Sequence, residues 1–192
     1  MDALEAILAR RSVSRLTDPA PEGDDLRRIL EAAVAAPDHN ELRPWRFTIL
    51  KGEAKVAFGK VLADSYLARV TELGGLPTDG QLDKERTKLG RAPLVIVVGA
   101  KHTHDTKIPW IEQRLAVGAA VENVLIAAAA LGYGSMWRTG DAAYDNAVKK
   151  AVDLDEHDAI IGFIYLGTPY EGGHAPSDRE LDVDGVVTEW SP

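Results

Sequence analysis

The sequence contains no cysteine in its 192 residues. This absence excludes disulfide bonds, a thiolate nucleophile and cysteine-ligated metal centres, since each of them needs the cysteine sulfur. It also suits a reducing compartment. The start, "MDALEAILAR", lacks the basic segment followed by an apolar one that is typical of a secretory signal. Together these features predict a cytoplasmic protein.

Excess positive charge is also missing, because the net charge is −8 and the pI is near 5.1. A general nucleic-acid-binding protein needs a basic surface to displace counterions from phosphates, so we expect no nucleic-acid partner. The longest apolar run, residues 115–134, is interrupted by Glu122 and Asn123. A glutamate at the centre of a bilayer is costly, and the run therefore predicts a buried helix and no membrane span.

Several signatures of protein-based catalysis are absent. There is no GxSxG nucleophile elbow and no GxxxxGK phosphate loop, and "GYGSMW" precedes an expected strand where a dinucleotide fingerprint would follow one. No pair of residues has the pattern of a general acid and base. His102 and His104 could be metal ligands, but no third ligand stands at a telling spacing, which favours a solvated loop. We therefore predict neither a catalytic side chain nor a metal site.

The sequence does contain alternating helical and strand patterns within a length and composition typical of one domain, residues 1–192. Six segments are predicted to be helical, at about residues 2–10, 24–36, 53–72, 81–90, 110–131 and 143–151. Apolar residues recur with helical spacing in the first two, and the fourth is short and charged. Strand patterns cover residues 45–50, 94–100, 133–139 and 159–167. No repeat or linker divides the chain, so the residues predict a single mixed α/β domain.

The segment "RRSVSRL", residues 10–16, follows the first expected helix and has two interpretations. Arg10 and Arg11 could neutralise the last exposed carbonyls of that helix, where cations are favourable. Alternatively, the arginines and Ser12 could bind an anion, because a guanidinium binds phosphate through two parallel hydrogen bonds. The spacing by itself favours the first interpretation.

Two further segments, "AAPDHNELRPW" and "WRTG", place polar and cationic residues beside apolar elements. Apolar walls with a few donors and arginines suit a flat aromatic ligand with an anionic tail. Each residue also has a structural interpretation. His39 could cap a turn, Trp137 could belong to the core, and Arg138 could pair with a surface carboxylate.

Taken in order, four segments resemble the FMN-dependent nitroreductases: "RRSVSRL", "AAPDHNELRPWRF", "VGAAVENVLIAAAALGYGSMWRTG" and "GFIYLGTP". The short chain and the "PDH" and "WRTG" variants are most similar to the compact, YdjA-type members. This resemblance implies an α+β sandwich in which helices flank a central mixed or antiparallel sheet. It also implies an obligate homodimer with two FMN sites at the dimer interface.

The resemblance further implies seven cofactor-binding residues, with Arg10 and Ser12 as phosphate ligands and His39 reaching the FMN of the other subunit. The full set is Arg10, Arg11, Ser12, His39, Trp137, Arg138 and Thr139. The chain departs from many relatives at Asp38, Glu41 and Arg43, near the expected flavin edge. After the last strand it offers only His174 where the family often has a basic residue.

The activity implied by the resemblance is that of an NAD(P)H-dependent FMN oxidoreductase. A reduced nicotinamide would give hydride to N5 of FMN and leave, and a nitroaromatic, quinone or similar acceptor would then take the reducing equivalents, in a ping-pong sequence. This chemistry requires no catalytic side chain. Two alternatives stay open at this point: a flavin carrier without turnover, and a dimeric interaction protein without a cofactor.

Overall fold

The computed structural model describes residues 2–170 and 181–191. In this part of the chain one antiparallel sheet of five strands has the order β1-β5-β3-β2, and β4 also pairs with β5. The strands are β1 (Leu16–Thr17), β2 (Trp45–Lys51), β3 (Leu94–Ala100), β4 (Gly134–Arg138) and β5 (Ala159–Pro169). The antiparallel α+β sandwich expected from the resemblance is therefore confirmed.

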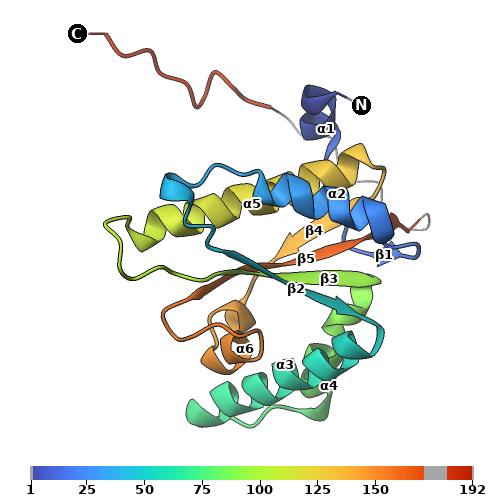
Figure 1. The fold of residues 1–192 in the computed structure, drawn as a ribbon. Coiled ribbons are helices and arrows are strands. Elements are labelled where there is room, and N and C mark those ends of the chain that lie inside the picture. Colours follow the sequence, from blue (N-terminus) through green and yellow to red (C-terminus); the bar gives the residue numbers. More distant parts are fainter. Residues whose placement is uncertain (1, 171–180, 192) are drawn as a thin grey trace.

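Helices cover both faces of the sheet: α2 and α5 lie on one face, and α3, α4 and α6 on the other (Figure 1). The α-helices are α1 (Ala3–Ala9), α2 (Gly23–Val34), α3 (Gly52–Glu72), α4 (Asp79–Thr87), α5 (Trp110–Ala130) and α6 (Asn146–Lys150). Three 3₁₀ turns are η1 (His39–Glu41), η2 (Lys88–Arg91) and η3 (Asp141–Ala143). The predicted helices and longer strands are confirmed, whereas the two-residue β1 was missed because it is too short to show a period.

Local sequence accounts for the helix ends. Asp2 caps α1 by accepting from the backbone N–H of Glu5, and the Glu5 side chain accepts from the backbone N–H of Asp2 in return. At the end of α5, Gly132 adopts a φ of +86°, a left-handed conformation that favours glycine. The chain can therefore turn directly from α5 into β4.

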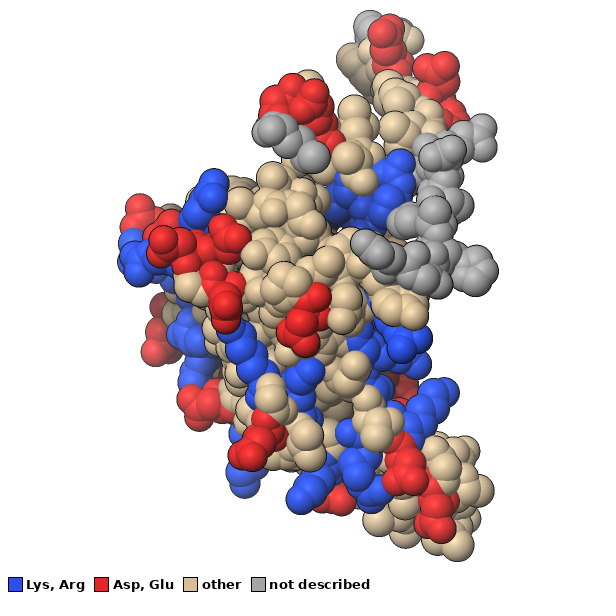
Figure 2. Space-filling model, turned by 90° about the vertical axis from the view of Figure 1, so that its right-hand side faces the viewer, with Lys and Arg blue, Asp and Glu red and all other residues tan. Residues whose placement is uncertain are grey.

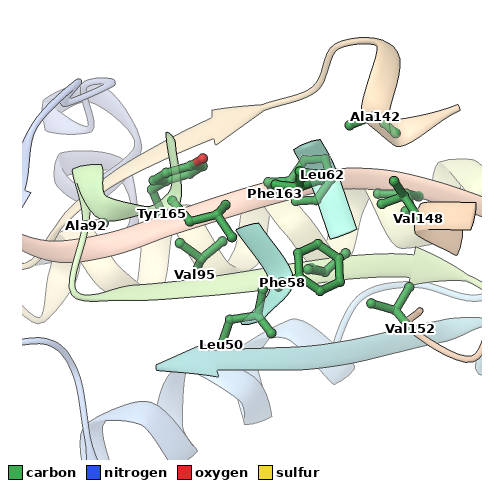
Figure 3. Packing of buried hydrophobic residues seen from close by; sticks show 14 of the residues in the cluster. Leu50, Phe58, Leu62, Ala92, Val95, Ala142, Val148, Val152, Phe163 and Tyr165 are labelled. Carbon is green, nitrogen blue, oxygen red and sulfur yellow. The ribbon is translucent and has the colours of Figure 1, made fainter. Parts of the chain in front are cut away.

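The core consists of two apolar clusters, one on each face of the sheet. All seven residues of β3 are buried, and they alternate between the clusters, so that Val95 and Val97 face α3 while Ile96 and Val98 face α5. Figure 3 shows the first cluster, in which Phe58 of α3 lies over the sheet. This double burial explains why the sequence of β3 is continuously apolar.

Helix α5 is the one described helix whose length and composition would allow it to cross a membrane. In this fold, however, it lies across the sheet, and Val117, Val121 and Val124 are fully buried. Part of its surface is still apolar and exposed, because Ile111 and Leu115 are 60% and 65% accessible. The apolar residues of α5 therefore belong to the core on one side of the helix and form an exposed surface on the other.

Candidate functional site

The first and third predicted cofactor segments lie side by side. Ser12 forms a parallel bridge with Ser135 of β4, and the Val13 N–H donates to the Ser135 carbonyl at 2.9 Å. Trp137 and Arg138 complete the same strand, and Thr139 follows it. The fold thus brings together segments that are more than 120 residues apart in the sequence.

The two interpretations of the segment "RRSVSRL" concern different arginines. Arg11 donates from Nη1 to the carbonyls of Leu8 and Arg10 at 2.5 and 3.0 Å, so it satisfies the end of α1. Arg10 instead faces α5, where its Nε lies 3.5 Å from Oε1 of Glu122, and its side chain is only 15% exposed. The Arg10 side chain therefore does not cap α1, although its backbone N–H donates to the Ala6 carbonyl at the helix end. Its predicted role toward an anion stays a prediction.

Trp137 packs against the neighbouring strand, β5. Its Nε1 donates to the carbonyl of Ile161 at 3.0 Å. A Cβ on Gly162 would lie 2.2 Å from that nitrogen, so only glycine allows the indole to approach so closely. Trp137 is still 37% exposed, and the structure thus presents one part of a fixed aromatic side chain at the surface.

At the end of β4 the chain forms a pocket of about 490 Å³ with a strongly cationic lining. We call it the β4 pocket, and it is lined by Lys84, Lys88, Arg91, Arg138, Thr139, Gly140, Phe163 and Tyr165. Of these residues, only Arg138 and Thr139 were predicted as site residues. Positive and negative side chains are mixed over the surface seen in Figure 2, so this local concentration of cations is not part of a generally basic surface.

The sequence does contain a signal for the missed cations. Lys84, Lys88 and Arg91 are spaced i, i+4 and i+7, which puts their side chains on one face of a helix. The 3₁₀ turn η2 continues α4 and keeps them on the same side as β4. Lys88 is paired with Glu85 at 2.5 Å, whereas Lys84 and Arg91 have no carboxylate partner in the described residues.

Arg138 has an unsatisfied polar atom. Among the described residues, its Nε is the buried side-chain nitrogen without a hydrogen-bond partner. The guanidinium lies 5.7 Å from the ring centre of Tyr165. Burial raises the pKa of the Tyr165 phenol, although Arg138 and Arg91 oppose the shift, so the ring stays neutral at physiological pH. The site therefore has cations and neutral donors for an anion, as a phosphate group requires.

Arg10 and Arg138 contact opposite layers of the molecule. Arg10 is directed toward Glu122 of α5, while Arg138 lies over Tyr165, which belongs to the cluster beneath α3. Their neighbours Ser12 and Ser135 join the two segments at the sheet edge. A shared role for both arginines in holding one phosphate stays a prediction.

His39 lies apart from these residues in the chain. It begins η1, and its Nδ1 is 2.7 Å from Oε2 of Glu112 in the first turn of α5. Glu112 and the Arg10 partner Glu122 are separated by ten residues of one helix, or about 15 Å. Within a single chain, His39 therefore does not lie beside the other predicted cofactor segments. That His39 reaches the FMN of a second subunit stays a prediction.

Asp38, Glu41 and Arg43, which depart from the family pattern, form a small polar network in the loop that carries His39. Oδ2 of Asp38 accepts from the Arg43 N–H at 2.5 Å, and Arg43 Nη2 lies 3.4 Å from Oε2 of Glu41. All three residues are thus engaged with one another within the loop. His174 lies outside the described residues.

His102 corrects the expectation of a solvated loop. Its side chain is fully buried, Nδ1 donates to the His157 carbonyl at 2.7 Å, and Nε2 accepts from Arg114 Nε at 3.1 Å. Trp110 stacks on it at 5.0 Å between ring centres. Sequence reasoning missed this role because two of the partners of His102, at residues 157 and 158, lie far along the chain.

The profile of the Nitroreductase family matches residues 7–168. The chain is 42% identical over 169 residues to "Putative NAD(P)H nitroreductase YdjA" of Escherichia coli K12, covering 88% of this chain and 89% of that protein. A nitroreductase-like family protein from Bacillus cereus has a similar structure, with a TM-score of 0.80, 22% identity and coverage of 100% and 97%. A "putative nitroreductase in complex with fmn" from Desulfovibrio desulfuricans has a TM-score of 0.69 and 26% identity, and the match covers 100% of this chain and 99% of that one.

Proposed function

The chain belongs to the nitroreductase family, and on that premise we propose that it is an NAD(P)H-dependent FMN oxidoreductase. The observation that carries this proposal is the β4 pocket, in which a buried arginine nitrogen without a partner lies among three further cations. The similarity to a protein in complex with FMN and to one named as an NAD(P)H nitroreductase supports the choice of cofactor and electron donor.

When bound, FMN supplies the redox chemistry by taking and giving hydride at N5. The residues of this chain bind and orient it. Arg138 and Thr139 provide a charged and a neutral donor at the end of β4. Lys84 and Arg91, which have no carboxylate partner in the described residues, provide further positive charge. These groups would stabilise a phosphate dianion. Trp137 adds a fixed aromatic surface on the other side of the strand.

The proposal includes a homodimer with FMN at its interface. Ile111 and Leu115 leave an apolar strip exposed on α5, which a second copy would cover. His39 adjoins this strip through its contact with Glu112 and could then serve the other subunit. Light scattering of the purified protein is expected to give twice the chain mass. A monodisperse monomer that retains FMN would contradict the shared site.

The visible spectrum provides the main test of the proposed function. Purified protein should be yellow with flavin absorbance bands, and anaerobic NADH or NADPH should bleach it. Addition of a nitroaromatic compound or a quinone should restore the colour, since these are the proposed acceptors. Protein that stays yellow with both nicotinamides would be a flavin carrier. Colourless protein that does not take up added FMN would be an interaction protein. The cytoplasmic location stays part of the proposal.

A further inference from the structure

We propose that Glu112 is a positioning residue that holds His39 in one orientation and one tautomer for the flavin of a second subunit. The inference rests on the proposed function, which assigns His39 to the partner's FMN. It adds a residue outside the four segments that carry the family resemblance. Three features of the structure support it: the contact itself, the strained loop that carries His39, and the anchored helix turn that carries Glu112.

The contact determines which ring nitrogen of His39 is available. Nδ1 lies 2.7 Å from Oε2 of Glu112, and a carboxylate can only accept a hydrogen bond. The Nδ1 atom must therefore carry the proton. Nε2 is left as the ring atom that can meet a ligand, as an acceptor when the ring is neutral and as a donor when it is charged.

The loop around His39 has an uncommon backbone. Asn40, Glu41 and Arg43 have φ values of 60°, 52° and 50°, in the left-handed region that non-glycine residues rarely adopt. Such conformations persist when surrounding contacts enforce them, and they concentrate at functional sites. Here the Asp38 carboxylate accepts from the Arg43 N–H and closes the loop. The loop thus presents His39 in a fixed place instead of leaving it on a relaxed turn.

The first turn of α5 gives Glu112 a rigid base. The neighbouring Gln113 is buried, accepts from the Thr103 N–H at 2.9 Å, and donates to the carbonyls of Thr103 and Ile108 at 3.1 and 3.2 Å. Trp110, two residues before Glu112, stacks on the buried His102 with an interplanar angle of 4°. A side chain on so constrained a turn can hold its partner more accurately than one on a free loop.

A double-mutant cycle on FMN binding tests the inference. Apoprotein is titrated with FMN in four forms: wild type, His39→Ala, Glu112→Gln and the double variant. We expect each single change to raise the dissociation constant about three- to tenfold, the equivalent of one hydrogen bond. The double variant should bind like His39→Ala, since Glu112 acts only through His39. Glu53→Gln, an exposed glutamate in the first turn of α3, is the matched control and should bind like wild type.

Nitrogen NMR of labelled histidine supplies a readout that a merely structural role would not move. The His39 signals, assigned by their loss in His39→Ala, should show protonated Nδ1 in the wild-type apoprotein. Glu112→Gln should mix the tautomers, because an amide can both donate and accept.

Failure of this inference can be distinguished from failure of the proposed function. If wild type binds FMN and is bleached by a nicotinamide, but Glu112→Gln binds FMN as wild type does, the inference is wrong and the function stands. Additive losses in the double variant, or an unchanged tautomer in Glu112→Gln, would also overturn it. A wild-type protein that binds no FMN would overturn both.

Discussion

The two ends of α5 show opposite ways of treating polar groups. At its N-terminal end lies the histidine cluster, which consists of His102, His104, Trp110 and His157, and the neighbouring Gln113 has partners for its donors and its acceptor. The strand that follows its C-terminal end leads to the β4 pocket, where Arg138 Nε has no partner within the described residues. A satisfied buried network stabilises the fold, whereas a buried donor without a partner in a cationic pocket is a candidate contact for an anion.

The largest effect on stability should come from the N-terminal end of α5, where the buried polar groups have partners. Gln113→Ala would remove three hydrogen bonds and leave buried backbone groups of Thr103 and Ile108 unpaired. We expect the free energy of unfolding to fall by about 3 kcal/mol, as measured by urea denaturation. The control is Gln81→Ala, which removes an exposed cap on Thr78 and should cost less than about 1 kcal/mol. Equal losses of unfolding free energy in the two variants would show that the hydrogen bonds of Gln113 contribute no more than a surface contact.

A change in the β4 pocket should weaken ligand binding and leave the stability of the fold nearly unchanged. Arg138→Ala should raise the FMN dissociation constant roughly ten- to a hundredfold, because a charge-assisted hydrogen bond to phosphate contributes about 1.5–3 kcal/mol. Riboflavin, which lacks the phosphate, should be affected much less. The stability of the apoprotein should fall by less than about 1 kcal/mol, since Nε has no partner to lose and the contact of the guanidinium with the Tyr165 ring is the interaction removed.

Two related variants complete that experiment. Arg10→Ala should act in the same direction as Arg138→Ala if both arginines hold one phosphate. Arg15→Ala is the control, because that guanidinium lies 4.6 Å from the ring centre of Tyr170 and outside the β4 pocket. Equal losses for FMN and riboflavin in the Arg10 and Arg138 variants would remove both residues from the phosphate site.

A smaller effect should appear in the pH dependence of stability. Burial lowers the pKa of His102 from its ordinary value of 6.5, and the charge of Arg114 acts in the same direction. The unfolded chain therefore binds a proton at a higher pH than the folded protein does. The stabilisation from neutral His102 is complete above about pH 6.5 and is lost as the pH falls through the lowered value.

Denaturation curves between about pH 7.5 and pH 5.5, roughly one unit above and below the ordinary histidine pKa of 6.5, would measure this loss. His102→Asn should be less stable at neutral pH but should show a flatter slope than wild type. Parallel slopes for the two proteins would mean that His102 does not cause the acid sensitivity.

The smallest effect is expected at the rim of the β4 pocket. Lys84 is exposed, so water and salt screen its charge. Lys84→Gln should weaken FMN binding by less than about threefold, and the difference should disappear at high salt. Isothermal titration at two ionic strengths would measure it. A larger, salt-independent loss would place Lys84 in direct contact with the ligand.

The sequence by itself determined the six α-helices of the described residues, the longer strands and the family. The helices predicted at residues 53–72 and 110–131 and the continuously apolar strand predicted at residues 94–100 correspond to α3, α5 and β3. These patterns are local consequences of which side chains must be buried, so they can be read from neighbours in the chain. The family resemblance likewise depends on short segments that stay intact in the sequence.

Only the tertiary structure decided which of the cations share a pocket. Lys84, Lys88 and Arg91 lie some fifty residues before Arg138, and only the pairing of β4 with β5 and the position of α4 beside the sheet put them together. It also decided that His102 is buried and that His39 rests on Glu112, 73 residues away. Burial and pairing at such separations depend on how the layers pack, and this information is spread over the whole chain and absent from any single motif.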